Sequence, residues 1–204
     1  MSDDNRPAPM DPAAVRRGRL IAGGLFAIAL VPVLLATLMY YTGWFVPSST
    51  TNKGELVAFG ESIFDTGLRG EQGEPLEPRY MPDNGDATWW FVIVADPCEE
   101  VCQEWLYLSR QVHIRLNREA DKVQRAFWST NPDVLDRDEH PLIEVLSHED
   151  NGIPKLPEGA SPEEGPFVYI VDRMGTFALR YDESHEGTDL LEDIRHLIST
   201  SPHG

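Results

Sequence analysis

Two cysteines, Cys98 and Cys102, are the only thiols in the 204-residue chain, and three residues separate them. Thiols this close together can form a disulfide, alternate between dithiol and disulfide, or bind a soft metal such as Cu(I) as thiolates. A disulfide that closes so small a loop restrains the unfolded chain very little. A static structural bond therefore explains the pair less well than redox or metal chemistry does, although it stays open as an alternative.

The residues before the cysteines predict a strand that leads into a helix. Trp89–Val94 is a continuous apolar run, which is typical of a strand buried on both faces. Asp96-Pro97 then predicts a helix start, with Asp as the cap and Pro in the first helical position. Apolar residues follow at helical spacing: Val101, Trp105, Leu108, Val112 and Leu116.

This arrangement places both cysteines at the junction between strand and helix. A spacing of four residues puts the two sulfurs on one helix face, within reach of each other. The start of a helix favours a thiolate and so activates Cys98. The neighbouring carboxylates of Glu99 and Glu100 act in the opposite direction.

The rest of the chain predicts an α/β domain with a mixed sheet. Thr188 is expected to cap a final helix whose apolar residues face inward. The predicted elements are a strand at Val123–Trp128, a strand or helix turn at Leu142–Leu146, a hairpin of Phe167–Val171 with Thr176–Tyr181 around the turn Asp172–Gly175, and a closing helix with Leu190, Leu191, Ile194, Leu197 and Ile198 on its buried side.

The N-terminal part predicts one membrane-spanning helix. No charged residue lies between Arg19 and Lys53, and about 20 apolar residues suffice to cross the hydrocarbon core. Arg16, Arg17 and Arg19 flank the apolar run on its N-terminal side, so the positive-inside rule keeps the N-terminus in the cytoplasm. The expected division is a cytoplasmic tail at 1–19, a transmembrane helix at 20–45, a linker with an irregular lead-in and short strands at 46–86, and a domain outside at 87–204.

The charge of the chain excludes one class of partner. Of its 17 basic and 34 acidic residues, only four basic and three acidic ones lie at or before Arg19, so the remainder carries 13 and 31, a net charge of −18. Nucleic-acid binding is excluded, because phosphate contacts require basic residues. Solubility explains the acidity most simply, and attraction of a basic partner is the alternative.

The order of elements and the cysteine position resemble the thioredoxin fold. The string Pro166-Phe167-Val168-Tyr169-Ile170-Val171-Asp172-Arg173-Met174-Gly175 is similar to a segment of membrane-anchored TlpA-like thioredoxins. On that resemblance, Pro166 is the cis-proline that faces the cysteines, and a thiol–disulfide oxidoreductase is implied.

The three-residue spacing of the cysteines is instead similar to that of the Sco/SenC copper chaperones, which take part in cytochrome c oxidase assembly. The strings at 51–57 and 107–113 resemble a group of uncharacterised Sco-like proteobacterial membrane proteins. This resemblance implies Cu(I) as the candidate metal, with Cys98 and Cys102 as ligands. It also implies a place in the bacterial inner membrane with the domain in the periplasm, and oxidase subunits or other assembly factors as partners.

The sequence departs from the Sco pattern at two positions. Gln103 follows the second cysteine where Sco proteins have proline. Glu164, with Glu163 beside it, occupies the position expected for the histidine that is the third copper ligand.

Of the other histidines, His185 is the one that could approach the cysteines, although a loop histidine is more often simply solvated. His113 lies three helical turns beyond Cys102, which is too far, and His185 lies in a polar loop before the last helix. The remaining histidines are expected at the surface or in terminal segments: His140, His148, His196 and His203.

Two hypotheses from different classes follow. The first is a periplasm-facing assembly factor for a copper-containing oxidase, which handles thiols or Cu(I) through Cys98 and Cys102 with Pro166 shaping the site. The second is a non-catalytic interaction module whose cysteines form a static disulfide. The chain has no motif of a conventional enzyme such as a nucleotide-binding glycine loop or a His-Glu-x-x-His zinc site; if it is an enzyme, it is a thiol–disulfide oxidoreductase.

Overall fold

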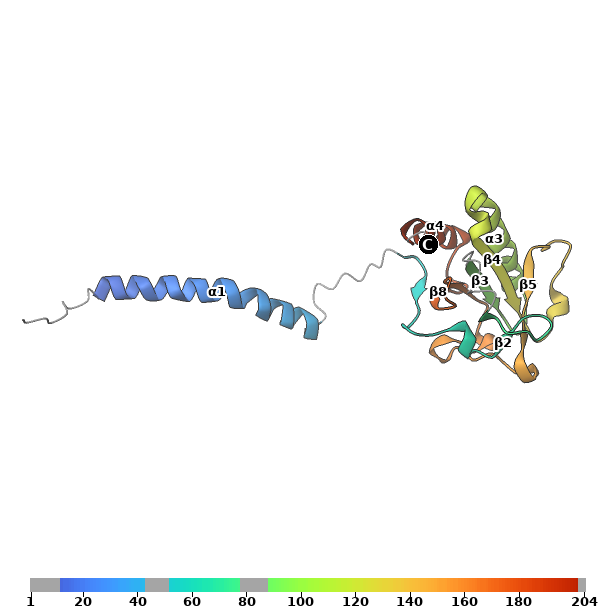
Figure 1. Ribbon diagram of the computed structural model, residues 1–204, viewed down its shortest axis with the longest axis horizontal. Coiled ribbons are helices and arrows are strands. Elements are labelled where there is room, and N and C mark those ends of the chain that lie inside the picture. Colours follow the sequence, from blue (N-terminus) through green and yellow to red (C-terminus); the bar gives the residue numbers. More distant parts are fainter. Residues whose placement is uncertain (1–11, 43–51, 78–87, 202–204) are drawn as a thin grey trace, which may run out of the picture. The chain divides into compact units, whose positions relative to one another are not determined.

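The structure, a computed structural model, describes residues 12–42, 52–77 and 88–201 (Figure 1). The chain forms two compact units, the first up to Thr50 and the second from Thr51 onward. The two units are considered separately below.

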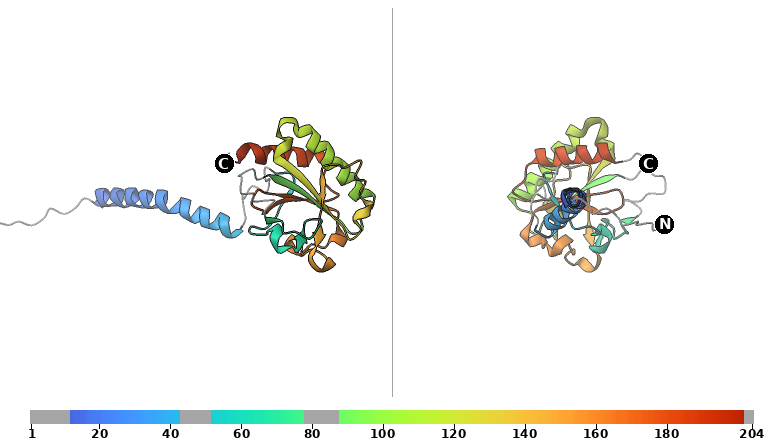
Figure 2. Two further views of the ribbon diagram at one scale, coloured as in Figure 1. Left: turned by 45° about the vertical axis from the view of Figure 1, so that its right-hand side comes forward. Right: turned by 90° about the vertical axis from the view of Figure 1, so that its left-hand side faces the viewer.

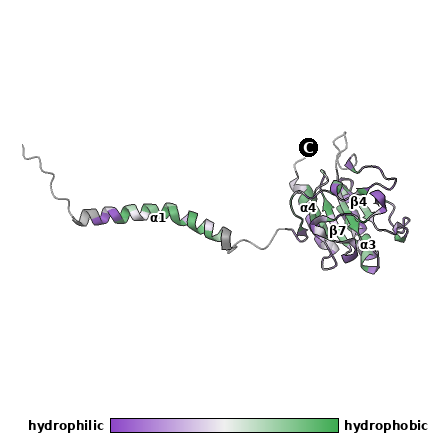
Figure 3. Cartoon of the chain, turned by 90° about the horizontal axis from the view of Figure 1, so that it is seen from below, coloured by the Kyte–Doolittle hydropathy of each residue, from purple (hydrophilic) through white to green (hydrophobic). Residues whose placement is uncertain are grey.

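The first unit contains a single long helix, α1, which runs from Pro12 to Thr42. Its stretch Arg16–Met39 is the one helix in the described part of the chain that is long and apolar enough to cross a membrane (Figure 3). Large apolar side chains such as Phe26 and Ile28 are about 70% exposed along it. Exposed apolar surface of this extent marks a contact with lipid or protein.

The second unit is built on a six-stranded mixed sheet in the order β1-β8-β7-β3-β4-β5. β3, β4 and β5 run parallel, and β7, β8 and β1 are added antiparallel. The strands are β1 (Glu55–Leu56), β3 (Trp89–Val94), β4 (Val123–Trp128), β5 (Ile143–Val145), β7 (Phe167–Val171) and β8 (Phe177–Tyr181), with β2 (Leu68–Arg69) and β6 (Ser147–His148) in a separate pair. The predicted mixed sheet is confirmed.

Helices α3 (Glu100–Leu116) and α4 (Gly187–Thr200) cover one face of this sheet (Figure 2). Alternate residues of β3 divide between the two faces: Phe91 and Ile93 pack under the helices, whereas Val92 and Val94 pack against the opposite cover. That cover is made by the lead-in and by the loops after β5. Six short 3-10 helices complete the described elements: Ile63–Asp65, Asn117–Lys122, Pro132–Val134, Glu149–Asn151, Pro157–Gly159 and Pro162–Glu164.

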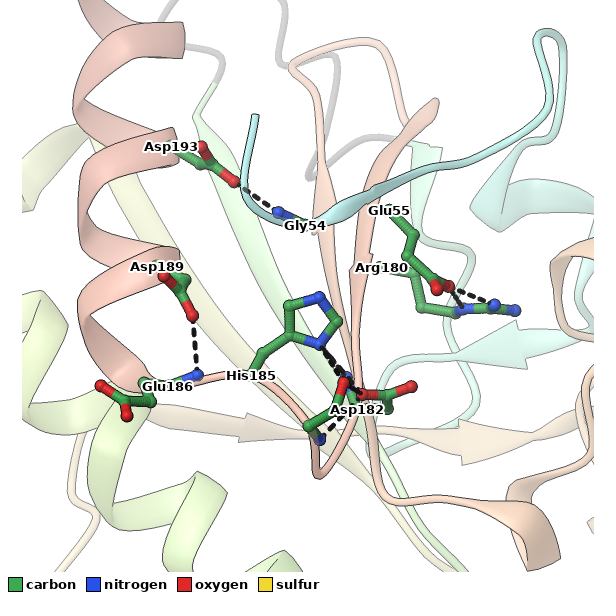
Figure 4. A network of polar contacts seen from close by, with 9 residues as sticks. Gly54, Glu55, Arg180, Asp182, His185, Glu186, Asp189 and Asp193 are labelled. Atoms are coloured by element: carbon green, nitrogen blue, oxygen red, sulfur yellow. Dashed lines mark hydrogen bonds and ion pairs between the residues drawn. The ribbon is translucent and has the colours of Figure 1, made fainter. Parts of the chain in front are cut away.

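The lead-in before β3 packs on the domain. Ile63, Leu68 and Leu76 are buried in the core on the face opposite the helices. β1 forms one edge of the sheet by pairing with β8, and Arg180 of β8 donates two hydrogen bonds to the carboxylate of Glu55 (Figure 4). The segment therefore lies on the domain through both main-chain and side-chain contacts.

A buried carboxylate fastens the start of the lead-in to α4. Asp193 is 2% exposed, and it accepts hydrogen bonds from the backbone N–H groups of Lys53 and Gly54 at 2.8–3.0 Å (Figure 4). It also accepts a 2.7 Å hydrogen bond from the hydroxyl of Tyr181. We call this group of contacts the Asp193 clamp. Its donors satisfy a charge that would otherwise be costly to bury.

Both helices begin at other residues than the sequence predicts. α3 starts at Glu100, because Asp96 uses its carboxylate to accept from the Thr130 hydroxyl and its N–H to reach the Pro162 carbonyl. α4 starts at Gly187 rather than after Thr188, and the Asp189 carboxylate accepts from the N–H of Glu186 at its start. The predicted caps were wrong because tertiary and neighbouring contacts took those roles.

Candidate functional site

The two cysteines lie at the end of β3 and form a disulfide, with a Cα–Cα distance of 5.1 Å. Cys98 lies in the loop before α3 and is half-buried, whereas Cys102 lies in the first turn of the helix and is 1% exposed. The expectation that both lie on one helix face is wrong for Cys98, because the helix begins two residues after it. The loop position leaves Cys98 as the sulfur that a second molecule can reach.

Pro166 approaches the same end of the sheet. The peptide bond between Gly165 and Pro166 is cis, as the resemblance to thioredoxins implies. β7 begins at the next residue, Phe167, which pairs with Val94 at the end of β3. The cis-proline loop precedes β7 and the cysteine loop follows β3. Because β3 and β7 are neighbouring antiparallel strands, both loops lie at the same end of these strands. A Cβ added at Gly165 would lie 3.1 Å from the Val94 carbonyl oxygen, so glycine permits this close approach.

The side chain of Gln103 contacts Sγ of Cys98. Its side-chain amide nitrogen lies 3.6 Å from Sγ of Cys98 and donates to the Val134 carbonyl at 3.3 Å. The residue that departs from the Sco pattern thus supplies a hydrogen-bond donor where proline has none. An amide N–H directed at sulfur favours the thiolate when the disulfide is reduced.

The tryptophans of β3 and α3 are packing residues. Trp105 of α3 is 2% exposed and lies 6.4 Å from Tyr181 between ring centres. Trp89 and Trp90 on β3 are also buried, on opposite faces of the sheet. Trp89 and Trp105 share the core under the helices with Cys102, and Trp90 lies in the core on the other face.

The residues proposed for a third copper ligand do not meet the cysteines in a common cluster. Glu164 is exposed and accepts a hydrogen bond from the backbone of Ser161, which caps a short 3-10 helix. A carboxylate suits hard cations rather than Cu(I). Across residues 12–42, 52–77 and 88–201, no group of three or more His, Cys, Asp or Glu side chains is arranged to hold a metal ion.

The other two candidate histidines have partners of their own. His113 bonds the Val123 carbonyl through Nε2 at 2.9 Å. His185 pairs through Nδ1 with the Asp182 carboxylate at 2.9 Å and packs edge-on against Tyr181 (Figure 4). Its side chain is 13% exposed, so this loop histidine is fixed rather than freely solvated.

His140 was expected at the surface, and this prediction is wrong. It is 3% exposed and lies beside Arg125, a buried arginine of β4. Burial and the positive charge of Arg125 lower the pKa of His140, and burial lowers the pKa of Arg125 to about 10. Its neighbours in sequence are mostly charged, so no local pattern indicates that it is buried.

The sequence of this domain matches a family model described as the transmembrane-like, thioredoxin-like, C-terminal domain, over residues 89–201. The chain belongs to this family. The match covers the region from the first residue of β3 to the end of α4. It confirms the predicted thioredoxin-like fold.

Solved structures with the same fold include Sco proteins. Apo Sco1 from Thermus thermophilus is 18% identical, with a TM-score of 0.52, and the alignment covers 74% of this chain and 99% of that one. Yeast Sco1 with copper bound is 14% identical, with a TM-score of 0.48 and coverage of 67% and 88%. The predicted likeness to Sco/SenC proteins is thereby confirmed for the fold. No curated protein matches the sequence.

Proposed function

We propose that this protein is a membrane-anchored thiol–disulfide protein that acts in the assembly of a cytochrome c oxidase. The observation that carries the proposal is the Cys98–Cys102 disulfide that follows β3, in which Cys98 is half-buried and Cys102 is buried. The cis peptide bond between Gly165 and Pro166 precedes the neighbouring strand β7 at the same end of the sheet. The resemblance of the cysteine spacing and topology to Sco proteins supports the oxidase as the setting.

The burial of the two sulfurs indicates how exchange proceeds. A client thiolate attacks Sγ of Cys98, the Cys98–Cys102 bond breaks, and Cys102 leaves as a thiolate that takes up a proton. The second client thiol then attacks the mixed disulfide and releases Cys98. The client dithiol becomes a disulfide and the protein becomes a dithiol, with two electrons and two protons transferred, and the reverse reaction reduces a client. Cys102 suits the leaving role because the N-terminal turn of a helix stabilises negative charge.

The anchor and its flanks support a periplasmic place for this chemistry. Arg16, Arg17 and Arg19 precede the apolar part of α1, and the positive-inside rule would keep that end in the cytoplasm of a bacterium. The cysteines would then lie in an oxidising compartment, where exchange of disulfides is supported.

The redox proposal is tested on the full chain in detergent, by equilibration in buffers of defined potential and counting of free thiols by maleimide mass shift. We expect a midpoint between about −120 and −270 mV, the range of exchanging thiol proteins. A disulfide that stays closed below about −300 mV would favour the static interaction module instead.

Transfer of Cu(I) is the second candidate, which the two thiols favour and Glu164 disfavours. It predicts that the reduced chain binds one Cu(I) under anaerobic conditions and that Cys98→Ser abolishes this binding. Glu164→His would put a histidine at the position that the third ligand has in the Sco pattern, and on this candidate function it is expected to tighten binding. Stoichiometric binding that survives Cys98→Ser would exclude the cysteine pair as the copper site.

A further inference from the structure

A groove of about 510 Å³ runs between α3 and the loop that leads into α4, and neither cysteine is among its lining residues. Its apolar lining includes Val101, Trp105 and Leu108 of α3. Its volume lies in the range of ligand-binding clefts. We refer to it as the α3–α4 groove.

The length of the groove suits a polypeptide segment. Its lining runs along α3 from Val101 to Arg115, which at 1.5 Å per residue is about 21 Å. A segment of about four helical turns has this length. The exposed side chain of Tyr107 adds an aromatic ring to the lining, a residue type that is enriched at protein interfaces.

The charge of the groove selects the occupant. Glu104, Glu183 and Glu186 are all exposed along it, against a single guanidinium, that of Arg115. Opposite charge on a partner would accelerate encounter and fix its register. A second copy of the domain is disfavoured as occupant, because two strongly acidic molecules repel each other.

The loop side of the groove is fixed before any partner arrives. Asp182 holds His185 through Nδ1, and the ring packs against Tyr181, which the Asp193 clamp holds in turn. Gly187 begins α4 beside Leu108, where an added Cβ would lie 3.1 Å from Cδ2 of Leu108. A preorganised wall lowers the entropy that binding would otherwise cost.

We propose that the α3–α4 groove binds a segment of a partner protein that has an apolar face flanked by lysine or arginine residues. The groove is separate from the thiol exchange, so the inference stands whether or not the cysteines react. Binding is therefore expected to be unchanged in Cys98→Ser.

The test uses a fluorescein-labelled 14-residue peptide of leucine and lysine, with leucines at helical spacing along one face. Its affinity for the full chain is measured by fluorescence anisotropy, in one detergent at one concentration, so that uptake into micelles is common to all samples. The double variant Glu104→Lys/Glu183→Lys is expected to weaken binding about tenfold at low salt, because two attractive charges become repulsive. Tyr107→Ser is expected to weaken it about threefold.

The matched control is Asp133→Lys/Glu163→Lys, which makes the same change of charge at exposed acidic residues outside the groove lining. It is expected to bind the peptide within twofold of the unaltered chain. Equal weakening in both double variants would overturn the proposal, since the peptide would then sense only the net charge. So would tight binding of a peptide with glutamate in place of lysine, or a dimer of this chain that Glu104→Lys/Glu183→Lys dissociates. Circular dichroism of each variant verifies that the domain is folded.

Discussion

Helices α3 and α4 lie on the same face of the same sheet, but the buried charges that fasten them differ. α4 carries Asp193, which accepts three backbone and side-chain donors at 2.7–3.0 Å. α3 is contacted by Arg125 of β4, whose Nη1 reaches the Leu106 carbonyl and the Ser109 hydroxyl at 3.5 Å, the outer limit of a hydrogen bond. Nε of Arg125 and Nδ1 of His140 have no hydrogen-bond partner among the described residues.

The difference indicates where the domain can tolerate change. A buried ion with short hydrogen bonds holds its element in place, whereas a buried ion at the limit of hydrogen bonding contributes little to stability. α3, which is contacted by the buried ion with the longer hydrogen bonds, carries Cys102 and one wall of the α3–α4 groove, where the proposed functions lie. Functional elements are often drawn from the less stable parts of a protein.

The largest expected effect comes from the Asp193 clamp. Asp193→Asn keeps the size of the side chain but removes its charge and places an amide against the donors of Lys53 and Gly54. We expect the free energy of unfolding to fall by about 2–4 kcal/mol, as for a broken buried hydrogen-bonded charge. Urea unfolding followed by near-ultraviolet circular dichroism measures this. Glu192→Gln on the same helix is the control. Glu192 is exposed, and its distance of 3.9 Å from the Lys53 ammonium makes a weak ion pair, so this variant should lower the free energy of unfolding by less than about 0.5 kcal/mol.

A pH dependence should come from the α3 side. Burial and the nearby Arg125 lower the pKa of His140 in the folded chain, with Arg110 acting in the same direction and Glu139 and Asp136 opposing. The unfolded chain therefore binds more protons below its ordinary histidine pKa of about 6.5, and stability is lost as the pH falls through that value. The slope due to one group is at most about 1.4 kcal/mol per pH unit.

Urea titrations at pH 7.5 and 5.5 on the native chain and on His140→Gln measure this contribution. We expect the loss of stability on acidification to be smaller in the variant. An identical loss in both chains would show that His140 does not titrate between these states.

Replacement of Arg125 should change the free energy of unfolding very little. Arg125→Met has similar volume and removes a buried charge with marginal hydrogen bonds, so we expect the free energy of unfolding to change by less than about 1 kcal/mol in either direction. Thermal unfolding of the variant beside Arg110→Met, an arginine of α3 at the surface, gives the comparison. A loss of 3 kcal/mol or more would show that Arg125 is as firmly satisfied as Asp193 and would remove the contrast between the helices.

The smallest expected effect is on the redox potential. Gln103→Leu removes the N–H that lies 3.6 Å from Sγ of Cys98, so the reduced form loses a stabilising contact. A hydrogen bond of about 0.5–1 kcal/mol corresponds to a midpoint lower by about 10–20 mV for a two-electron couple. Gln111→Leu, further along α3, is the control. A midpoint that rises in Gln103→Leu would contradict a role for the amide in stabilising the thiolate.

Much of the fold could be predicted because its signals are local. Trp89–Val94, Val123–Trp128 and Phe167–Val171 are strands with the predicted bounds. The first and the last are continuous apolar runs, and runs of this length leave few alternatives. The helix starts could not be predicted in the same way. Asp96 has the local chemistry of a cap, but Thr130 and Pro162, distant in sequence, bind it first.

Buried charges escape sequence reasoning for a related reason. Asp193 lies between Leu190 and Ile194 on the inward side of α4, but a carboxylate in a helix is ordinarily expected to face solvent. Donors distant in sequence satisfy it: the N–H groups of Lys53 and Gly54, about 140 positions earlier, and the hydroxyl of Tyr181. The cysteine pair could be recognised from its spacing alone. The contact between Gln103 and Cys98 could not, because it depends on the conformation of the loop before α3.

The Asp193 clamp also limits the length of the chain that connects α1 to the domain. Ten residues lie between Thr42, the last residue of α1, and Lys53, so the eleven steps from one to the other span at most about 40 Å when fully extended. With α1 in a bilayer, this connection would keep the domain close to the membrane. A short tether gives a tethered domain an effective concentration in the millimolar range. Release of the clamp would let the lead-in unpair from β8 and lengthen this connection, so the carboxylate of Asp193 helps to determine its maximum length.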